Sequence, residues 1–248
     1  MLRLLTLGTL PALLAVGVAS AGGTAVAFVA LPGRGEVVAV DVGSGDVLRR
    51  IEVAKGPQET AAYHDTSRRR DFVLVTSPPA GTVTLVDAFS QRVARVWDDF
   101  GAPADVVVEG LRAYVTDNAR GRLVVIDLRS RRVVASLPVG PRPRALAVGD
   151  LAIVAHDGRE SLTLVDLRRR KIAGSLPVGG VVQSISKRPD TADVFVTYRG
   201  TGPSRASTGA LGGWSSVEPS RGVQATSSRT STRAIAPGSR TRQVAGYA

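Results

Sequence analysis

Four aspartates recur along the chain at nearly even intervals, each at the end of a short run rich in valine and leucine. Asp41, Asp87, Asp127 and Asp166 are separated by 46, 40 and 39 residues. Carboxylates at a regular spacing could gather into a ring that binds a cation or transfers protons. An aspartate that ends a strand can instead accept hydrogen bonds from the amides of the following turn. We favour this turn-capping interpretation, because the runs before the aspartates are typical of strands.

Few other residues point to catalysis. The chain has two histidines, His64 and His156, and no cysteine, which excludes disulfides, thiolate metal sites and thiol nucleophiles. Ser184 and Lys187 fit an S-x-x-K motif, but the S-D-N and K-T-G partners of that motif do not follow. The segment 200–202 lacks the spacing of a dinucleotide-binding loop. We therefore predict no catalytic residue, no cofactor and no metal, and favour a protein that is not an enzyme.

The aspartate runs belong to a longer repeat of about 40 residues. Its third copy reads ADVVVEG (104–110), LRAYVTDNARG (111–121), RLVVIDLRSRR (122–132) and VVASLPVGPRP (133–143), and the fourth copy has the same order. Each copy contains four short runs rich in Val, Ile, Leu and Thr, separated by turn residues. This pattern predicts a four-stranded antiparallel sheet. Such sheets repeated at this period are typical of the blades of a β-propeller.

One stretch of the repeat resembles a known family. Residues 113–148 read AYVTDNARGRLVVIDLRSRRVVASLPVGPRPRALAV. They resemble the YVTN-type β-propeller repeat of surface-layer-like and YncE-like exported proteins, with Asp-Asn at 117–118 where the family has Asn. The second copy has Ser-Pro at 77–78, and the fourth has Ala-His at 155–156. The resemblance implies a propeller that usually closes with seven blades, and it implies no single activity, because the family's roles are diverse or unassigned.

The repeat region is too short for seven blades. Residues 24–199 hold four to four and a half units. We therefore predict an all-β fold with about 4–5 four-stranded antiparallel blades, which is an incomplete seven-bladed ring. An open ring exposes sheet edges and apolar surface, and this favours self-association through those edges.

The N-terminus is typical of a secretion signal. A basic start at 1–3 is followed by the uncharged and mostly apolar residues 4–18, and then by Ala19-Ser20-Ala21. We predict a signal peptide over 1–21 that is cleaved after Ala21, and a secreted, extracellular or periplasmic mature protein without a membrane span. The alternative is an uncleaved membrane anchor, because no charged residue occurs between Leu4 and Gly33.

The composition changes after the propeller region of 22–199. Residues 200–248 are rich in Ser, Thr, Gly and Arg and contain a single acid, Glu218. This composition predicts a disordered tail. A frameshift in a GC-rich gene is the alternative, because a shifted frame yields a similar composition. In another frame, residues 227–233 can be read as a strand followed by an aspartate and a turn, which would make the chain a truncated family member.

The topology of a blade divides the charged loops between two faces. When the strands of a blade are called A to D, the A–B and C–D connections leave one face, and the B–C and D–A connections leave the other. The chain has a net charge of +11, and many cations fall in the first set of connections. We call this side the basic face and define it by Arg68, Arg69, Arg70, Arg129, Arg131, Arg132, Arg168, Arg169, Arg170, Lys171, Lys187 and Arg188.

The other side, which we call the opposite face, has a mixed set of loop residues that could bind a small polar ligand. They are Asp117, Asn118, Arg120, Arg142, His156, Asp157 and Arg159. We predict an exported propeller that acts as a binding or scaffold protein for an unassigned ligand, with a protein or an anionic polymer as partner. The alternatives are a lactonase-like or quinoprotein-like enzyme, a non-functional remnant, and a binder of nucleic acid or anionic envelope polymers through the basic face.

Overall fold

The computed structural model describes residues 16–21, 24–187, 194–199, 214–216 and 230–237. Its strands form five four-stranded sheets, and in four of them the strands follow one another in chain order. The first sheet contains β1 (Val16–Ala21), β2 (Thr24–Leu31), β3 (Glu36–Asp41) and β4 (Val47–Glu52). The second contains β5 (Thr60–Asp65), β6 (Arg70–Ser77), β7 (Thr82–Asp87) and β8 (Arg92–Trp97). The third contains β9 (Pro103–Glu109), β10 (Arg112–Asp117), β11 (Arg122–Asp127) and β12 (Arg132–Pro138). The fourth contains β13 (Pro143–Val148), β14 (Leu151–His156), β15 (Ser161–Asp166) and β16 (Lys171–Pro177).

The fifth sheet departs from chain order. It contains β17 (Val181–Lys187), β18 (Val194–Arg199), β20 (Thr230–Pro237) and β19 (Trp214–Ser216), paired in that order. The last two strands belong to the range 200–248, for which the sequence predicts disorder. Likewise, β1 belongs to the predicted signal segment and here pairs with β2. Signal cleavage after Ala21 stays a prediction, since pairing of β1 does not test it. The disorder of the other tail residues also stays a prediction, because they lie outside the described ranges.

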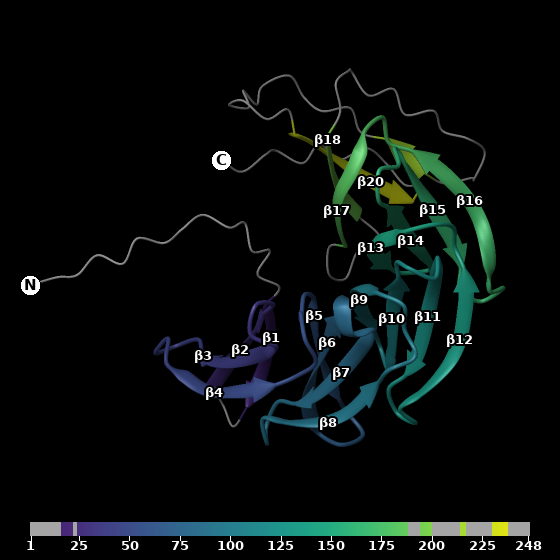
Figure 1. Ribbon diagram of the computed structural model, residues 1–248. Helices are drawn as coiled ribbons and strands as arrows, with labels where there is room; N and C mark the ends of the chain where they lie inside the picture. The colour runs from purple at the N-terminus through teal and green to yellow at the C-terminus, as the bar shows by residue number, and fades with distance from the viewer. Residues whose placement is uncertain (1–15, 22–23, 188–193, 200–213, 217–229, 238–248) are drawn as a thin grey trace, which may run out of the picture.

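The five sheets are the blades of an open propeller. The first strands β1, β5, β9, β13 and β17 contact one another in succession and therefore lie at the centre. In Figure 1 the blades follow an arc that does not close between the first blade and the fifth. The prediction of an all-β, incomplete propeller with about 4–5 blades is confirmed. The only helix among the described residues is the short 3-10 helix Pro78–Ala80, so none of them forms a helix that could cross a membrane.

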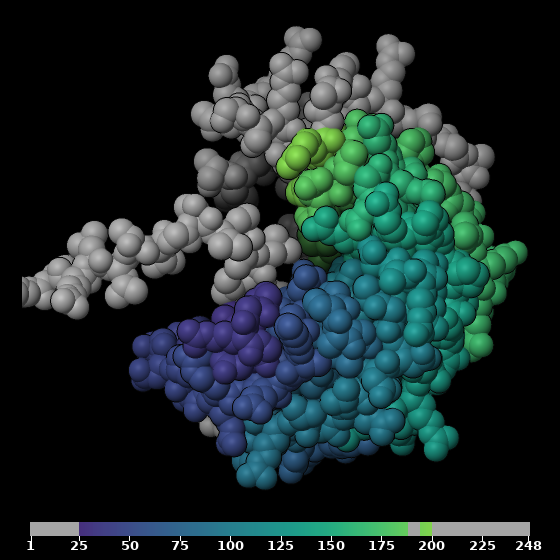
Figure 2. Space-filling model, in the orientation of Figure 1, coloured from purple at the N-terminus to yellow at the C-terminus, as the bar shows by residue number. Residues whose placement is uncertain are grey.

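The hydrophobic core is divided into layers between neighbouring blades. Phe72 and Leu74 of β6 pack toward the third blade, whereas Val73 and Val75 of the same strand pack toward the first. Two further layers join the third blade to the fourth and the fourth to the fifth. A strand covered on both faces needs apolar residues without alternation, and this explains the continuous run FVLV. Figure 2 shows the atoms of successive blades joined without a break along the arc.

The strand-ending aspartates cap the C–D turns. Asp41 accepts hydrogen bonds from the amides of residues 43 and 44, and Asp87 accepts them from those of residues 89 and 90. Asp127 and Asp166 each accept one from the amide three residues later. The turn-capping interpretation of the repeated aspartates is therefore confirmed. The capped turns hold the backbone of residues 127–130 and 166–169, which include three cations of the basic face.

Candidate functional site

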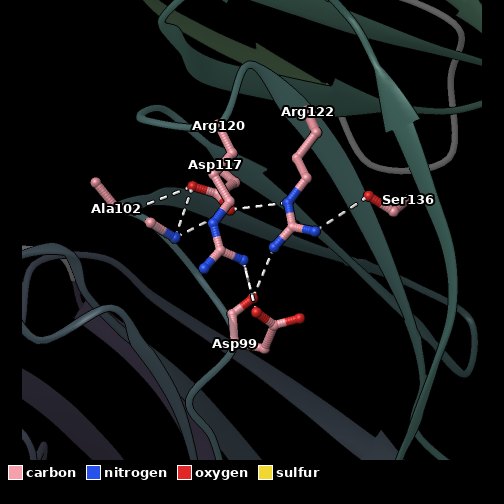
Figure 3. A network of polar contacts seen from close by, with 7 residues as sticks. Asp99, Ala102, Asp117, Arg120, Arg122 and Ser136 are labelled. Atoms are coloured by element: carbon pink, nitrogen blue, oxygen red, sulfur yellow. Dashed lines mark hydrogen bonds and ion pairs between the residues drawn. The ribbon is translucent and has the colours of Figure 1, made fainter.

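Asp117, at the end of β10 and facing the opposite face, is fully buried. Its carboxylate accepts hydrogen bonds from the amides of Gly101 at 3.1 Å and Ala102 at 3.0 Å, and from Nε of Arg122 at 2.9 Å. Figure 3 shows these donors converging on it. Burial raises the pKa of Asp117, but the hydrogen bonds and the guanidinium outweigh burial and hold the pKa below its usual value. The charged carboxylate therefore fixes the segment that enters β9.

Two arginines of the same blade bind one exposed acid in the D–A connection. Arg120 donates from Nη1 to Oδ1 of Asp99 at 2.6 Å, and Arg122 donates from Nη2 to the Asp99 carbonyl at 2.6 Å. Figure 3 shows both side chains reaching the same residue. The side chain of Asp99 is 84 % exposed, so this part of the network is open to solvent and to a ligand.

His156, at the end of β14, is buried. Its Nδ1 lies 2.9 Å from the carbonyl oxygen of Pro141, and its Nε2 lies 2.9 Å from the hydroxyl of Thr163. The carbonyl can only accept, so Nδ1 bears the proton. Burial lowers the pKa of His156, against the hydrogen bond to Pro141. The neutral ring therefore joins two segments of the fourth blade and is shielded from solvent.

The loops of the third and fourth blades meet at Asp157. Nδ2 of Asn118 donates to the Pro143 carbonyl at 3.1 Å and to Oδ2 of Asp157 at 2.9 Å. Nη2 of Arg142 donates to the Asp157 carbonyl at 3.2 Å. Arg159 is exposed in the same turn as Asp157. The predicted residues 118, 142 and 157 are thus brought together, whereas Asp117 and His156 lie beneath the surface.

The buried residues on this side share one position in the blade. Ser77, Asp117, His156 and Tyr198 each occupy the place of Asp117 in the register of their sheets. The Ser77 hydroxyl donates to the Ala54 carbonyl at 3.2 Å. A Cβ placed on Gly180 would lie 2.5 Å from Cδ2 of Tyr198. In four successive blades, the side chain at this position faces the segment that leads into the blade's own first strand.

Two acids near the propeller centre form a cluster that the motif search missed. The amides of Glu59 and Asp105 donate to Thr76 and Thr116, respectively, so the two acids share one register position. Burial and the charge of Glu59 raise the pKa of Asp105 to about 7. Burial also raises the pKa of Glu59, against the charge of Arg144. The sequence signal for this cluster is that Glu59 in GPQE and Asp105 in APAD are acids at equivalent positions of two successive repeats.

On the basic face, five of the predicted cationic side chains have contacts within the fold. Arg68 binds Asp65 and donates to the Arg129 carbonyl of the next blade at 3.1 Å. Arg131 lies 5.5 Å from the centre of the Phe72 ring. Further ion pairs join Arg70 to Asp87, Arg169 to Asp166 and Lys187 to Glu109. The carbonyl of Arg129 is held, but its side chain forms no ion pair among the described residues.

The other described cations of the basic face are exposed, and their side chains form no ion pair within the described ranges. They are Arg69, Arg132, Arg168, Arg170 and Lys171. Three of them follow Asp166 in one C–D turn, next to the paired Arg169. Arg188 lies outside the described residues. This cationic group is therefore available to an anionic ligand.

The residues considered for catalysis are bonded elsewhere. Nδ1 of His64 lies 2.6 Å from Oδ1 of Asp71 on the next strand. The hydroxyl of Ser184 lies 2.7 Å from that of Thr197, whereas Lys187 faces Glu109. Within the described part of the chain, no three acids or histidines are placed to hold a metal ion.

The chain is similar to one protein family and to several solved structures. A family model described as outer membrane protein assembly factor BamB matches residues 7–137. No curated protein sequence matches the chain. Hydrazine synthase of Kuenenia stuttgartiensis is similar, with a TM-score of 0.65 and 19% identity over 77% of this chain and 56% of that chain. The β-propeller domain of Cps50 (Swd1) from Myceliophteria thermophila has a TM-score of 0.59 and 15% identity over 73% of this chain and 63% of that chain.

A further solved structure shares the fold at lower coverage. Dihydro-heme d1 dehydrogenase NirN in complex with DHE has a TM-score of 0.53 and 20% identity over 70% of this chain and 39% of that chain. The chain thus spans less than two thirds of each of these three proteins. At such identities the likeness shows the propeller fold alone.

Proposed function

Because the chain belongs to the family described as outer membrane protein assembly factor BamB, we propose that it is an exported propeller that acts as a binding or scaffold module. Its binding surface is the basic face, and its partner is anionic. Export is supported by the basic and then apolar N-terminus that ends in Ala19-Ser20-Ala21. The YVTN-like order of residues 113–148 supports a place among exported propellers of that type.

One observation carries this choice of surface. The C–D turn of the fourth blade presents Arg168, Arg170 and Lys171 to solvent without an ion pair among the described residues. The acid of the same turn, Asp166, is occupied by the amide and guanidinium of Arg169 at 2.8 and 3.1 Å. Unpaired cations in fixed turns attract polyanions through their field and through release of counterions. On the opposite face, by contrast, six of the seven predicted residues are hydrogen-bonded within the fold: Asp117, Asn118, Arg120, Arg142, His156 and Asp157.

The test is the salt dependence of binding to long-chain inorganic polyphosphate, a polymer without apolar groups. We expect binding whose affinity falls steeply with salt. Replacing Arg132, Arg168 and Lys171 with Gln should reduce the logarithmic salt slope by about 2–3, because each phosphate contact adds about one. Binding that is absent or independent of salt would refute the proposal.

A matched variant separates the surface from net charge. Arg34, Lys55 and Arg159 are exposed on the opposite face, and their side chains have no ion pair among the described residues. Replacing these three with Gln lowers the net charge equally and should leave most of the polyphosphate affinity. Equal losses in the two triple variants would show that net charge, and not the basic face, determines binding.

A further inference from the structure

An exposed apolar side chain recurs where the outermost strands of the first four blades leave the basic face. Val47, Val93, Val133 and Ile172 lie opposite the residue that precedes the capping aspartate of the neighbouring strand. They are 54, 41, 48 and 52 % exposed. Single exposed apolar residues are ordinary, but four at one register position of four successive blades form a row along the rim.

Two turns extend this row. Phe89 is 68 % exposed in the C–D turn of the second blade, and Val42 is 54 % exposed in that of the first. The backbone of Phe89 is held, because its amide donates to Asp87 at 3.0 Å. We define the rim as these two turn residues together with Val47, Val93, Val133 and Ile172.

Cations alternate with the apolar residues of the rim. Arg92, Arg132 and Lys171 directly precede Val93, Val133 and Ile172, and all three are exposed. The capping acids of these turns are bound by turn amides, and two of them also pair with arginines. The first blade has no Lys or Arg in its turn 41–47, so charge and apolar surface coincide in blades two to four.

We propose that this rim docks on an anionic lipid surface. The inference rests on the proposed function, since it names the partner of the basic face. A soluble polyanion satisfies the cations but leaves Phe89 and Ile172 in water. A bilayer with acidic headgroups offers phosphates to the cations and, just below them, hydrocarbon to the apolar side chains. The cations of the rim complement a soluble polyanion and an acidic bilayer equally well. The row of exposed apolar side chains favours the bilayer.

The test compares vesicle binding of two single variants of the full chain. Ile172→Ser removes a rim residue that is 52 % exposed. Val96→Ser removes a side chain that is similarly exposed, at 44 %, but lies farther from the turn, on β8. Both variants retain every charge. Binding is measured by sedimentation with vesicles of phosphatidylcholine alone and with phosphatidylglycerol added.

We expect binding to the phosphatidylglycerol vesicles, little binding to phosphatidylcholine, and an affinity about tenfold lower for the rim variant than for the control variant. Polyphosphate binding should be equal in all of these proteins. If polyphosphate binds and anionic vesicles do not, or if the rim variant binds vesicles as the control does, the lipid proposal fails while the proposed function stands. If neither probe binds, the proposed function fails as well.

Discussion

Oδ2 of Asp105, on the innermost strand of the third blade, accepts a 2.7 Å hydrogen bond from the amide of Leu146, on the innermost strand of the fourth. A titratable carboxyl therefore joins two blades at the propeller centre. Burial and the neighbouring Glu59 raise the pKa of this carboxyl to about 7. Charge at this contact is thus unfavourable, and its protonation should strengthen the fold.

The first prediction concerns pH. Folding raises the pKa of Asp105 from 3.8 to about 7, so the native state binds more protons than the unfolded state between these values. The contribution of Asp105 to stability is therefore present at low pH and is lost as the pH rises through about 7. Asp105→Asn keeps an acceptor for Leu146 and should be more stable than the wild type at pH 8, by about 2 kcal/mol.

Urea unfolding between pH 4 and pH 8 measures this difference, which should vanish near pH 4. His156 acts against this loss of stability with rising pH, because its lowered pKa makes the fold less stable at acidic pH. The difference between the variant and the wild type cancels the contribution of His156, which both proteins contain. Asp150→Asn makes the same chemical change at an exposed site. A difference between wild type and Asp105→Asn that does not change with pH would contradict the prediction.

The second prediction concerns the anchor of β9. Asp117→Ala leaves two backbone amides and the guanidinium of Arg122 without their acceptor. Removing one partner of such a buried group should lower the free energy of unfolding by about 3–5 kcal/mol. Asp99→Ala, at a side chain 84 % exposed, should lower the free energy of unfolding far less, because solvent screens its ion pair with Arg120. Similar losses in the two variants would show that burial of Asp117 is unimportant.

The third prediction separates two adjacent arginines of the basic face. Arg131 covers the Phe72 ring and has a positive φ of 56°, whereas Arg132 is exposed. Arg131→Gln should lower stability by about 1 kcal/mol and leave polyphosphate binding nearly unchanged. The turn itself accepts glutamine, because Gln91 has a φ of 52° in the corresponding turn.

Arg132→Gln should do the reverse: it should weaken polyphosphate binding and leave the unfolding midpoint in place. Thermal unfolding and titration on the same samples compare the two variants. The assignment of Arg131 to the fold is wrong if both substitutions affect the same property.

The fourth prediction concerns a close contact in the fifth blade. A Cβ on Gly180 would lie 2.5 Å from Cδ2 of Tyr198 and 2.8 Å from the Arg199 carbonyl. Gly180→Ala should therefore destabilise the protein by about 1–3 kcal/mol. Gly33→Ala, where a Cβ meets nothing within 4 Å, is the matched control. Equal midpoints in urea for these two variants would rule out the contact.

The repeat of aspartate-ended strands was sufficient to predict the blades and their turns, because it reports strand length and turn position directly. It could not predict the roles of Asp117 and His156, since each bonds backbone groups of the loop that enters its blade, and no side-chain motif records such a partner. Nor could it identify Asp105, whose pKa depends on burial between blades. The different roles of Arg131 and Arg132 also required the structure, because the side chains of adjacent residues in a turn point in different directions.

The buried residue at the equivalent position of the second strand differs in each of blades two to five: it is Ser77, Asp117, His156 and Tyr198 in turn. Gly101 offers an amide to Asp117, but the corresponding Pro141 has no N–H, and there His156 donates to a carbonyl instead. An aspartate at position 156 would lose the donor that Gly101 supplies to Asp117, and an Nδ1–H donor at position 117 would meet the Gly101 amide. Blades so alike in sequence could exchange loops during folding. The mismatch of donors and acceptors between the third and fourth blades disfavours such an exchange, so each connection bonds best to the second strand of its own blade.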